Sequence, residues 1–164
     1  MDSIFKRVSV RNFEPRQVEP EKIEKILRAG MAAPSAGNQQ PWEFYVVTNP
    51  QVIQELAKAS QYSGCAAKAP VVIVPVCKKE CWMPEYADID LSYACENMWL
   101  EADALGLGTV VLAITPFDDR KENVKKALNL PDDVYAYGLM PVGYPAAVRP
   151  QQDRFDPARV HYVI

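Results

Sequence analysis

The segment that most constrains this chain covers residues 33–44, with the sequence APSAGNQQPWEF. It follows a stretch of helical periodicity and leads into aromatic and β-branched residues that predict a strand. Pro34 and Pro41 each lack an amide donor and fix φ, so a helix cannot continue through the segment. The residues between them are small enough for a planar ligand to approach the backbone, and Ser35 and Asn38 offer a hydroxyl and an amide to hydrogen-bond it. An ordinary connection between a helix and a strand is the alternative interpretation.

A second segment, residues 7–13, alternates polar and apolar side chains, as an extended chain with one buried side does. Arg7, Ser9 and Arg11 fall on the polar side. Arginine offers planar, bidentate donors and serine a short one, so this side of the segment is suited to binding a phosphate. A solvated strand edge with scattered arginines is the alternative.

The length of 164 residues and the 49% of hydrophobic residues predict a single domain, residues 1–164, with one core. Because the net charge is -3, the chain has no general basic field for nucleic acid or an anionic membrane, and an anion must be held locally. No apolar run is long enough for a membrane span, and the amino terminus does not have the pattern of a signal peptide. We therefore expect a cytoplasmic protein with neither nucleic acid nor membrane as a partner.

The four cysteines, Cys65, Cys77, Cys81 and Cys95, do not form the paired C-x-x-C hooks of zinc or iron-sulfur sites. His161 is the only histidine of the sequence. We therefore expect no metal site and predict reduced, mostly buried thiols.

Hydrophobic periodicity predicts alternating helices and strands along the chain. The predicted helices cover residues 21–31, 52–59, 89–107 and 120–128, and the predicted strands cover residues 42–47, 70–77, 109–114, 135–142 and 160–164. Pro75 predicts that its strand lies at an edge or contains a bulge. Helix 89–107 is apolar on several sides, so it is buried in the core or against a partner, and Gly106 and Gly108 are expected to end it. The terminal strand follows an extended linker and suits pairing with another protomer.

Four motifs occur in one order along the chain: Arg-x-Ser-x-Arg-x-Phe from residue 7, Ala-Pro-Ser-x-x-Asn-x-Gln-Pro-Trp-x-Phe from residue 33, Gly-Leu-Gly-Thr from residue 106 and Gly-Tyr-Pro from residue 143. Together they resemble the FMN-dependent nitroreductase family over essentially the whole chain. The resemblance implies an α+β fold with a mainly antiparallel central sheet flanked by helices. It also implies an intertwined homodimer with one FMN at each of two interfacial sites.

The resemblance also assigns roles to individual residues near the FMN phosphate. Arg7 and Ser9, with Val8 between them, would hold the phosphate, and Arg154 matches a second phosphate arginine. Arg11 would reach the pyrimidine edge of the isoalloxazine ring, where a positive charge stabilises the reduced flavin.

Further residues would contact the ring and the ribityl chain. Those expected from the opposite protomer are Pro34, Ser35, Ala36 and Asn38. Gln61 would reach the polar edge of the ring, and the strand end beside flavin N5 would consist of Leu112, Ala113 and Ile114.

The activity implied by the resemblance is a ping-pong reaction in which NAD(P)H reduces FMN and a small acceptor then reoxidises it. The acceptor would be a nitroaromatic, a quinone or a flavin, and no acidic or basic catalytic side chain is required. The alternatives are a non-enzymatic flavin-binding module and an enzyme of the same fold with special chemistry, such as reductive dehalogenation or flavin destruction.

Overall fold

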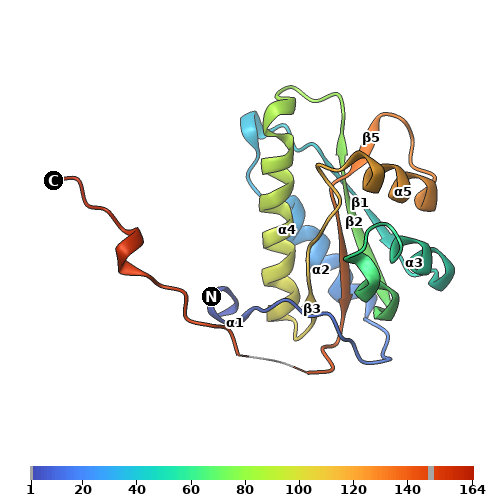
Figure 1. Cartoon of the computed structure of the whole chain (residues 1–164), viewed down its shortest axis with the longest axis horizontal. Coiled ribbons are helices and arrows are strands. Elements are labelled where there is room, and N and C mark those ends of the chain that lie inside the picture. Colours follow the sequence, from blue (N-terminus) through green and yellow to red (C-terminus); the bar gives the residue numbers. More distant parts are fainter. Residues whose placement is uncertain (1, 148–149) are drawn as a thin grey trace.

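The computed structural model describes residues 2–147 and 150–164. In this part of the chain, a six-stranded antiparallel sheet lies between two groups of helices (Figure 1). The helices are α1 (Ser3–Lys6), α2 (Pro20–Met31), α3 (Pro50–Leu56), α4 (Ala87–Ala104) and α5 (Asp118–Leu128), with short 3-10 turns at Ala36–Asn38, Ser63–Lys68, Pro84–Tyr86 and Pro157–Arg159. The strands are β1 (Trp42–Val47), β2 (Val71–Lys78), β3 (Gly108–Thr109), β4 (Leu112–Ala113), β5 (Val134–Ala136) and β6 (Gly138–Gly143).

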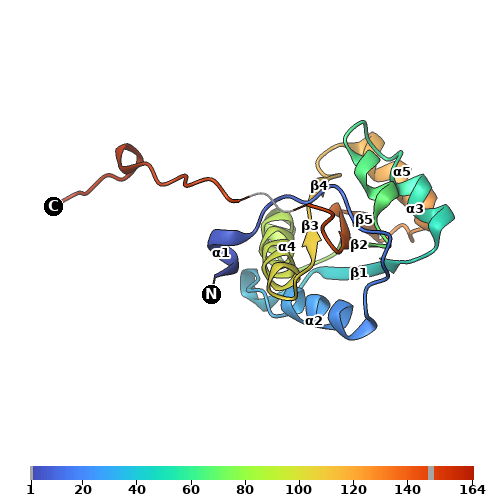
Figure 2. The same ribbon diagram turned by 90° about the horizontal axis from the view of Figure 1, so that it is seen from below.

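The sheet has the strand order β1-β2-β6-β3, with β4 also paired to β6 and β5 to β2. Every one of these pairs is antiparallel. Figure 2 shows α2 and α4 on one side of the sheet and α3 and α5 on the other. The predicted α+β fold with an antiparallel sheet flanked by helices is therefore confirmed.

Strand β2 is buried on both faces, which explains its nearly continuous apolar sequence. Val72, Val74 and Val76 pack in the core with α3 and α5. Val71 and Ile73 point to the opposite face and pack with α2 and α4. Successive side chains of a strand point to opposite faces, so two covered faces require apolar residues at every position.

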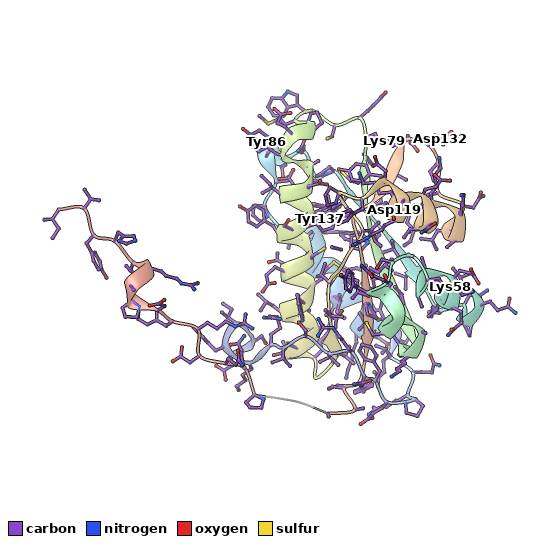
Figure 3. All side chains as sticks on the ribbon, viewed as in Figure 1. Lys58, Lys79, Tyr86, Asp119, Asp132 and Tyr137 are labelled. Atoms are coloured by element: carbon purple, nitrogen blue, oxygen red, sulfur yellow. The ribbon has the colours of Figure 1, made fainter. Side chains whose placement is uncertain are left out.

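Pro75 does not place β2 at an edge, contrary to one of the two expectations from the sequence. β2 pairs with β6 before Pro75 and with β5 after it, and the register shifts by one residue between the two pairings. This shift is a bulge, and its extra residue lies not in β2 but in the segment of the same chain that joins β5 to β6. The missing Pro75 N–H leaves the Tyr137 carbonyl free to accept from the amides of Ile114 and Thr115, at 3.2 and 3.0 Å. Tyr137 lies beside α4 (Figure 3), and its hydroxyl is 2.8 Å from Ser92 Oγ. The predicted strand 135–142 is therefore divided into β5 and β6.

The predicted strand 109–114 is also divided, into β3 and β4, which pair with β6 in one unchanged register. Gly106 ends α4 as predicted, with a φ of 73° and the Leu107 amide bonded to the Ala102 carbonyl at 2.8 Å. The prediction that Gly108 helps to end the helix is wrong, because Gly108 belongs to β3.

The predicted strand 160–164 is not formed within this chain. Residues 160–164 are exposed, with Tyr162 at 85% and Val163 at 100% of full exposure. The tail extends away from the body of the protein (Figure 1), so none of the strands in the described part of the chain lies beside it to supply hydrogen bonds.

The four cysteines are free thiols; Cys77 and Cys95 are buried, whereas Cys65 and Cys81 are half-buried. Burial raises the pKa of Cys95 to about 12 and that of Cys77 to about 11. Across residues 2–147 and 150–164, no group of three or more His, Cys, Asp and Glu side chains is arranged to hold a metal ion. None of the helices in the same ranges combines the length and the apolar character needed to cross a bilayer.

Candidate functional site

The amino-terminal segment is fixed on the sheet by backbone contacts. The Val10 amide donates to the Thr109 carbonyl at 3.0 Å, and Ser9 forms a parallel bridge with Thr109. Val10 and Phe13 are buried, whereas Ser9 and Arg11 are exposed. The predicted alternation is therefore present, and the polar side of this segment faces outward.

Two glycines allow the amino-terminal segment to lie close to the sheet. A Cβ atom on Gly108 would be 2.6 Å from the Cβ of Val10, and one on Gly143 would be 3.0 Å from Cδ1 of Phe13. Ordinary carbon contacts are about 3.5–4 Å, so a larger residue at either position would push the segment outward. The glycines of the Gly-Leu-Gly-Thr and Gly-Tyr-Pro motifs thus determine where Ser9 and Arg11 lie.

The polar side of the segment opens into a cavity of about 690 Å³. Its lining combines the amino-terminal segment, α4 and the carboxyl-terminal tail, and consists of Arg7, Val8, Ser9, Val10, Arg11, Asn12, Trp99, Ala147, Pro150, Gln151, Gln152 and Arg154. Among them are the four residues predicted at the phosphate, and also Arg11, which was predicted at the pyrimidine edge of the ring. A volume of this size is within the range of small-molecule sites, about 300–1,000 Å³.

Arg7 is held in place from three directions. Its guanidinium stacks on Trp99, with Cζ 4.1 Å from the ring centroid, and its Nε is 3.9 Å from a carboxylate oxygen of Glu96. The Gln151 side-chain amide donates to the carbonyls of Arg7 and Ile4, at 2.9 and 3.2 Å. The Arg7 side chain is only 15% exposed, so its donors are oriented before any ligand binds.

The donor set of this cavity fits an anionic ligand. Three guanidiniums and a serine hydroxyl line it, and within residues 2–147 and 150–164 Arg7 has the one long contact with Glu96, whereas Arg11 and Arg154 form no ion pair. Guanidinium groups bind phosphate oxygens in bidentate geometry. The residues present are therefore those that the dianionic phosphate of FMN requires.

Residues predicted beside the flavin ring form a second group, next to the first one along the sheet. Ala113 is exposed at the surface, whereas the side chains of Leu112 and Ile114 are buried in the core. Gln61 is exposed at the start of the segment that leads into the 3-10 turn Ser63–Lys68. None of these four residues lines the cavity described above.

This second group is connected to the amino-terminal segment. Lys68 donates to Asn12 Oδ1 at 3.3 Å, which joins the turn Ser63–Lys68 to the cavity wall. On the other side, Arg120 donates to the Ala113 carbonyl at 3.0 Å and lies 5.7 Å from the Tyr62 ring centroid. Tyr62 directly follows Gln61, so the two segments predicted at the ring, Gln61 and residues 112–114, lie near one another although they are far apart in the sequence.

The loop after α2 is fixed by the buried carboxylate of Asp90, which is 2% exposed. One oxygen of Asp90 accepts the Ala36 amide at 2.9 Å, and the other accepts the Gln39 side-chain amide at 2.7 Å. The side-chain oxygen Oε1 of Gln39 in turn accepts from the Met83 backbone amide at 2.8 Å. All of these groups are hydrogen-bonded, so the loop has one defined shape in which Asn38 adopts a φ of 56°.

The loop residues that are predicted to contact the cofactor lie far from the cavity of their own chain. The loop residues in question are Pro34, Ser35, Ala36 and Asn38, and none of them lines the cavity. The loop is attached at Asp90, whereas the cavity includes Trp99, which is nine residues farther along α4, a rise of about 14 Å. A single chain therefore brings together the residues that line the cavity, but it does not bring the loop to that cavity.

Sequence reasoning missed Trp99, Gln151 and Asp90. Trp99 has the spacing of a core residue on α4, and Gln151 lies in a polar tail, so neither has a local signal of its role. Asp90 could have been found, because an acidic residue within the apolar part of a helix must be hydrogen-bonded when buried.

The model of the Nitroreductase family matches this chain in two overlapping segments, residues 4–80 and 62–144. A protein of Methanothermobacter thermautotrophicus, provisionally named NADH dehydrogenase/NAD(P)H nitroreductase, is 35% identical over 162 residues, which cover 98% of this chain and 85% of the relative.

Two solved structures show the same fold. A protein of Clostridium acetobutylicum, provisionally named NADH oxidase, is 42% identical with a TM-score of 0.94, and the match covers 98% of each chain. A protein of Desulfovibrio desulfuricans, provisionally named a nitroreductase and solved in complex with FMN, is 27% identical with a TM-score of 0.86. The match covers 99% of this chain and 95% of that one.

Proposed function

The chain belongs to the nitroreductase family, and we propose that it is an FMN-dependent oxidoreductase that uses NAD(P)H to reduce a small acceptor. The observation that carries the proposal is the cavity in which Arg7, Ser9, Arg11 and Arg154 converge. A relative of the same fold is solved in complex with FMN. In a chain of net charge -3, such a cluster of cations in one cavity indicates a specific anionic ligand.

The residues of the cavity would divide the cofactor between them. Arg7, Ser9 and Arg154 would bind the phosphate, and Trp99 would keep the Arg7 guanidinium in position. Arg11 would lie at the pyrimidine edge of the ring. Its charge would favour the anionic reduced ring, because electrostatic stabilisation by a fixed cation is strong where water is excluded.

When bound, FMN supplies the redox chemistry, taking two electrons from a reduced nicotinamide and passing them to an acceptor such as a nitroaromatic, a quinone or a free flavin. The chain would bind and orient the cofactor and leave one face of the ring accessible. No side chain near the cavity is required as a general acid or base in this scheme.

The complete site would need a homodimer. The loop that carries Ser35 and Asn38 does not reach the cavity of its own chain, so a second protomer would supply it. β1 is paired on one side only, and Val46 on this edge strand is 41% exposed. The exposed residues 160–164 would pair with such an edge in the partner, because an unpaired edge and an unpaired extended segment satisfy each other's backbone groups.

Purification tests the proposal directly. The protein should be yellow, with about one FMN per chain, and NADH or NADPH should bleach it under anaerobic conditions. A nitroaromatic, a quinone and free FMN should each be tested as the acceptor that restores the colour. Recovery of intact FMN after many turnovers would distinguish this activity from flavin destruction, and a colourless protein that does not take up FMN would refute the proposal.

The assembly has a separate test. Sedimentation at low micromolar concentration should show a dimer, and removal of residues 156–164 should weaken the dimer and release FMN although Arg7, Ser9 and Arg154 remain. A stable monomer that retains stoichiometric FMN would refute the shared site.

A further inference from the structure

Arg120, in the first turn of α5, is a cation held in one position at the surface. Its Nη1 donates to the Ala113 carbonyl at 3.0 Å, and its Cζ lies 3.9 Å from the centroid of the Phe117 ring. The centroid of the Tyr62 ring lies 5.7 Å from the same Cζ. A guanidinium that is both hydrogen-bonded and stacked loses little further freedom when it binds a ligand.

The charge of Arg120 is not neutralised by a carboxylate. Within residues 2–147 and 150–164, no Asp or Glu oxygen lies within ion-pair distance of Arg120, and the neighbouring carboxylate of Asp118 contacts Lys121 at 3.3 Å. The guanidinium has five N–H donors, and the Ala113 carbonyl accepts one of them. Donors therefore remain for an external acceptor.

The two aromatic rings beside Arg120 are exposed at the surface. Phe117 is 47% exposed and Tyr62 is 66% exposed. Exposed aromatic rings next to an oriented cation form a surface to which a planar, anionic molecule can bind by stacking and by charge-assisted hydrogen bonds. This surface is separate from the phosphate cavity, whose lining includes none of the three residues.

The position of the surface relates it to the reaction. Arg120 touches the carbonyl of Ala113, which is predicted to lie beside flavin N5, and Tyr62 follows Gln61, which is predicted to reach the polar edge of the ring. We propose that Arg120, Phe117 and Tyr62 form a subsite for the carboxylate or phosphate group of a planar aromatic substrate that reacts at the flavin. This inference rests on the proposed function.

The test compares charged and neutral acceptors of the same shape with wild-type holoenzyme and an Arg120→Gln variant. After anaerobic reduction, reoxidation by 4-nitrobenzoate and by 4-nitrobenzamide is followed by stopped-flow absorbance. The second-order rate constant for the benzoate should fall about 10- to 100-fold in Arg120→Gln, the size of one charge-assisted hydrogen bond, and that for the amide should change little. Arg120→Lys keeps the charge without the planar fork and should lose less.

The anionic group could also come from the nicotinamide donor, so reduction of the bound flavin by NADPH and by NADH is measured in the same variants. NADPH carries a phosphate that NADH lacks, so a loss limited to reduction by NADPH would assign the subsite to the nicotinamide donor and also support it. The inference would be overturned if the rate constants in Arg120→Gln changed equally for the benzoate and the amide and also equally for NADPH and NADH. It would also be overturned if none of these rate constants changed.

Lys121→Gln is the matched control, because it removes the same charge from the next residue of α5. The Lys121 ammonium contacts Asp118 and the Tyr135 ring instead of the subsite, so this variant should not discriminate between the benzoate and the amide. FMN content and photoreduction of each variant show that the cofactor site is intact. If wild-type protein lacks FMN the proposed function fails, whereas an active flavoprotein with unchanged substrate ratios in Arg120→Gln refutes only this subsite.

Discussion

Replacing Gly108 with alanine should weaken FMN binding although no predicted ligand of the cofactor is changed. A Cβ atom at this position would lie 2.6 Å from both Cβ and Cγ2 of Val10 and 2.8 Å from its Cγ1. Carbon atoms in contact are about 3.5–4 Å apart, so Val10 would have to move by roughly 1 Å. Val10 is buried and bonded to the Thr109 carbonyl, so its displacement would carry Ser9 and Arg11 out of position.

The magnitude follows from these contacts. Overpacking of a buried site costs about 1–3 kcal/mol of stability. If the shift removes one charge-assisted hydrogen bond to the cofactor, FMN affinity should fall by about 1.5–3 kcal/mol, or roughly 10- to 150-fold in Kd. Combined with Gly108→Ala, Val10→Ala should not restore FMN binding, because alanine keeps the Cβ atom that clashes. Val10→Gly removes all three close atoms, so it should relieve the clash.

Fluorescence titration of the apoprotein with FMN measures the affinity, and urea unfolding measures the stability. Gly106→Ala is the control, since Gly106 has a φ of 73° and no atom lies within 4 Å of the added Cβ. This variant should lose about 1–2 kcal/mol of stability from backbone strain and bind FMN as the wild type does. Wild-type affinity in Gly108→Ala, or rescue by Val10→Ala, would refute the steric argument.

Three further predictions concern the loop held by Asp90, the redox potential of bound FMN and the loss of stability at alkaline pH. Asp90→Asn should lower the free energy of unfolding by about 2 kcal/mol, because the new side-chain NH2 group must face one of the two N–H donors that Asp90 now accepts from. Glu80→Gln, on the exposed surface, is the control and should change it by less than about 0.5 kcal/mol. Equal effects of the two substitutions in urea unfolding would show that the carboxylate does not hold the loop. Arg11→Met should lower the midpoint potential of bound FMN in spectroelectrochemical titration, and an unaltered potential would contradict the placement of Arg11 at the pyrimidine edge. Burial raises the pKa of Cys95 to about 12, so the folded state holds this proton more tightly than the unfolded chain, whose thiol has a pKa of about 8.5. The contribution of the thiol to stability is thus fully present below about pH 8.5 and is lost as the pH rises toward 12, by about 1.4 kcal/mol per pH unit. Cys95→Ala should therefore lose less free energy of unfolding than the wild type between about pH 8 and pH 10, and parallel losses would show that the thiol is not responsible.

Most elements of the fold could be predicted from local sequence. β1 has the predicted bounds, and α2 begins at Pro20, one residue before the predicted helix. Proline geometry, side-chain periodicity and β-branched composition act within a few residues, so they can be read without knowing what the segment packs against. The same holds for the alternation that places Arg7, Ser9 and Arg11 on one side of an extended chain.

The divisions of the predicted strands could not be predicted in this way. Residues 135–142 form two strands because the Tyr137 carbonyl, opposite Pro75, accepts from the amides of Ile114 and Thr115. Pro75 by itself indicated an edge or a bulge, and the choice depended on which strands lay on each side of β2. Residues 160–164 have the composition of a strand, but a strand needs a neighbour, and none of the strands described between residues 2 and 147 lies beside the tail.

The candidate site shows the same distinction between local chemistry and position. The sequence alone determined the kinds of group that meet there, because guanidinium and hydroxyl donors suit a phosphate wherever they lie. The tertiary structure decided the rest. Trp99 lies beneath Arg7, Gln151 holds the Arg7 carbonyl, Gly108 lets Val10 approach the sheet, and Asp90 fixes the loop. Each of these contacts joins segments that are distant in the sequence, and their closeness depends on how helices and sheet pack, which no local pattern of residues encodes.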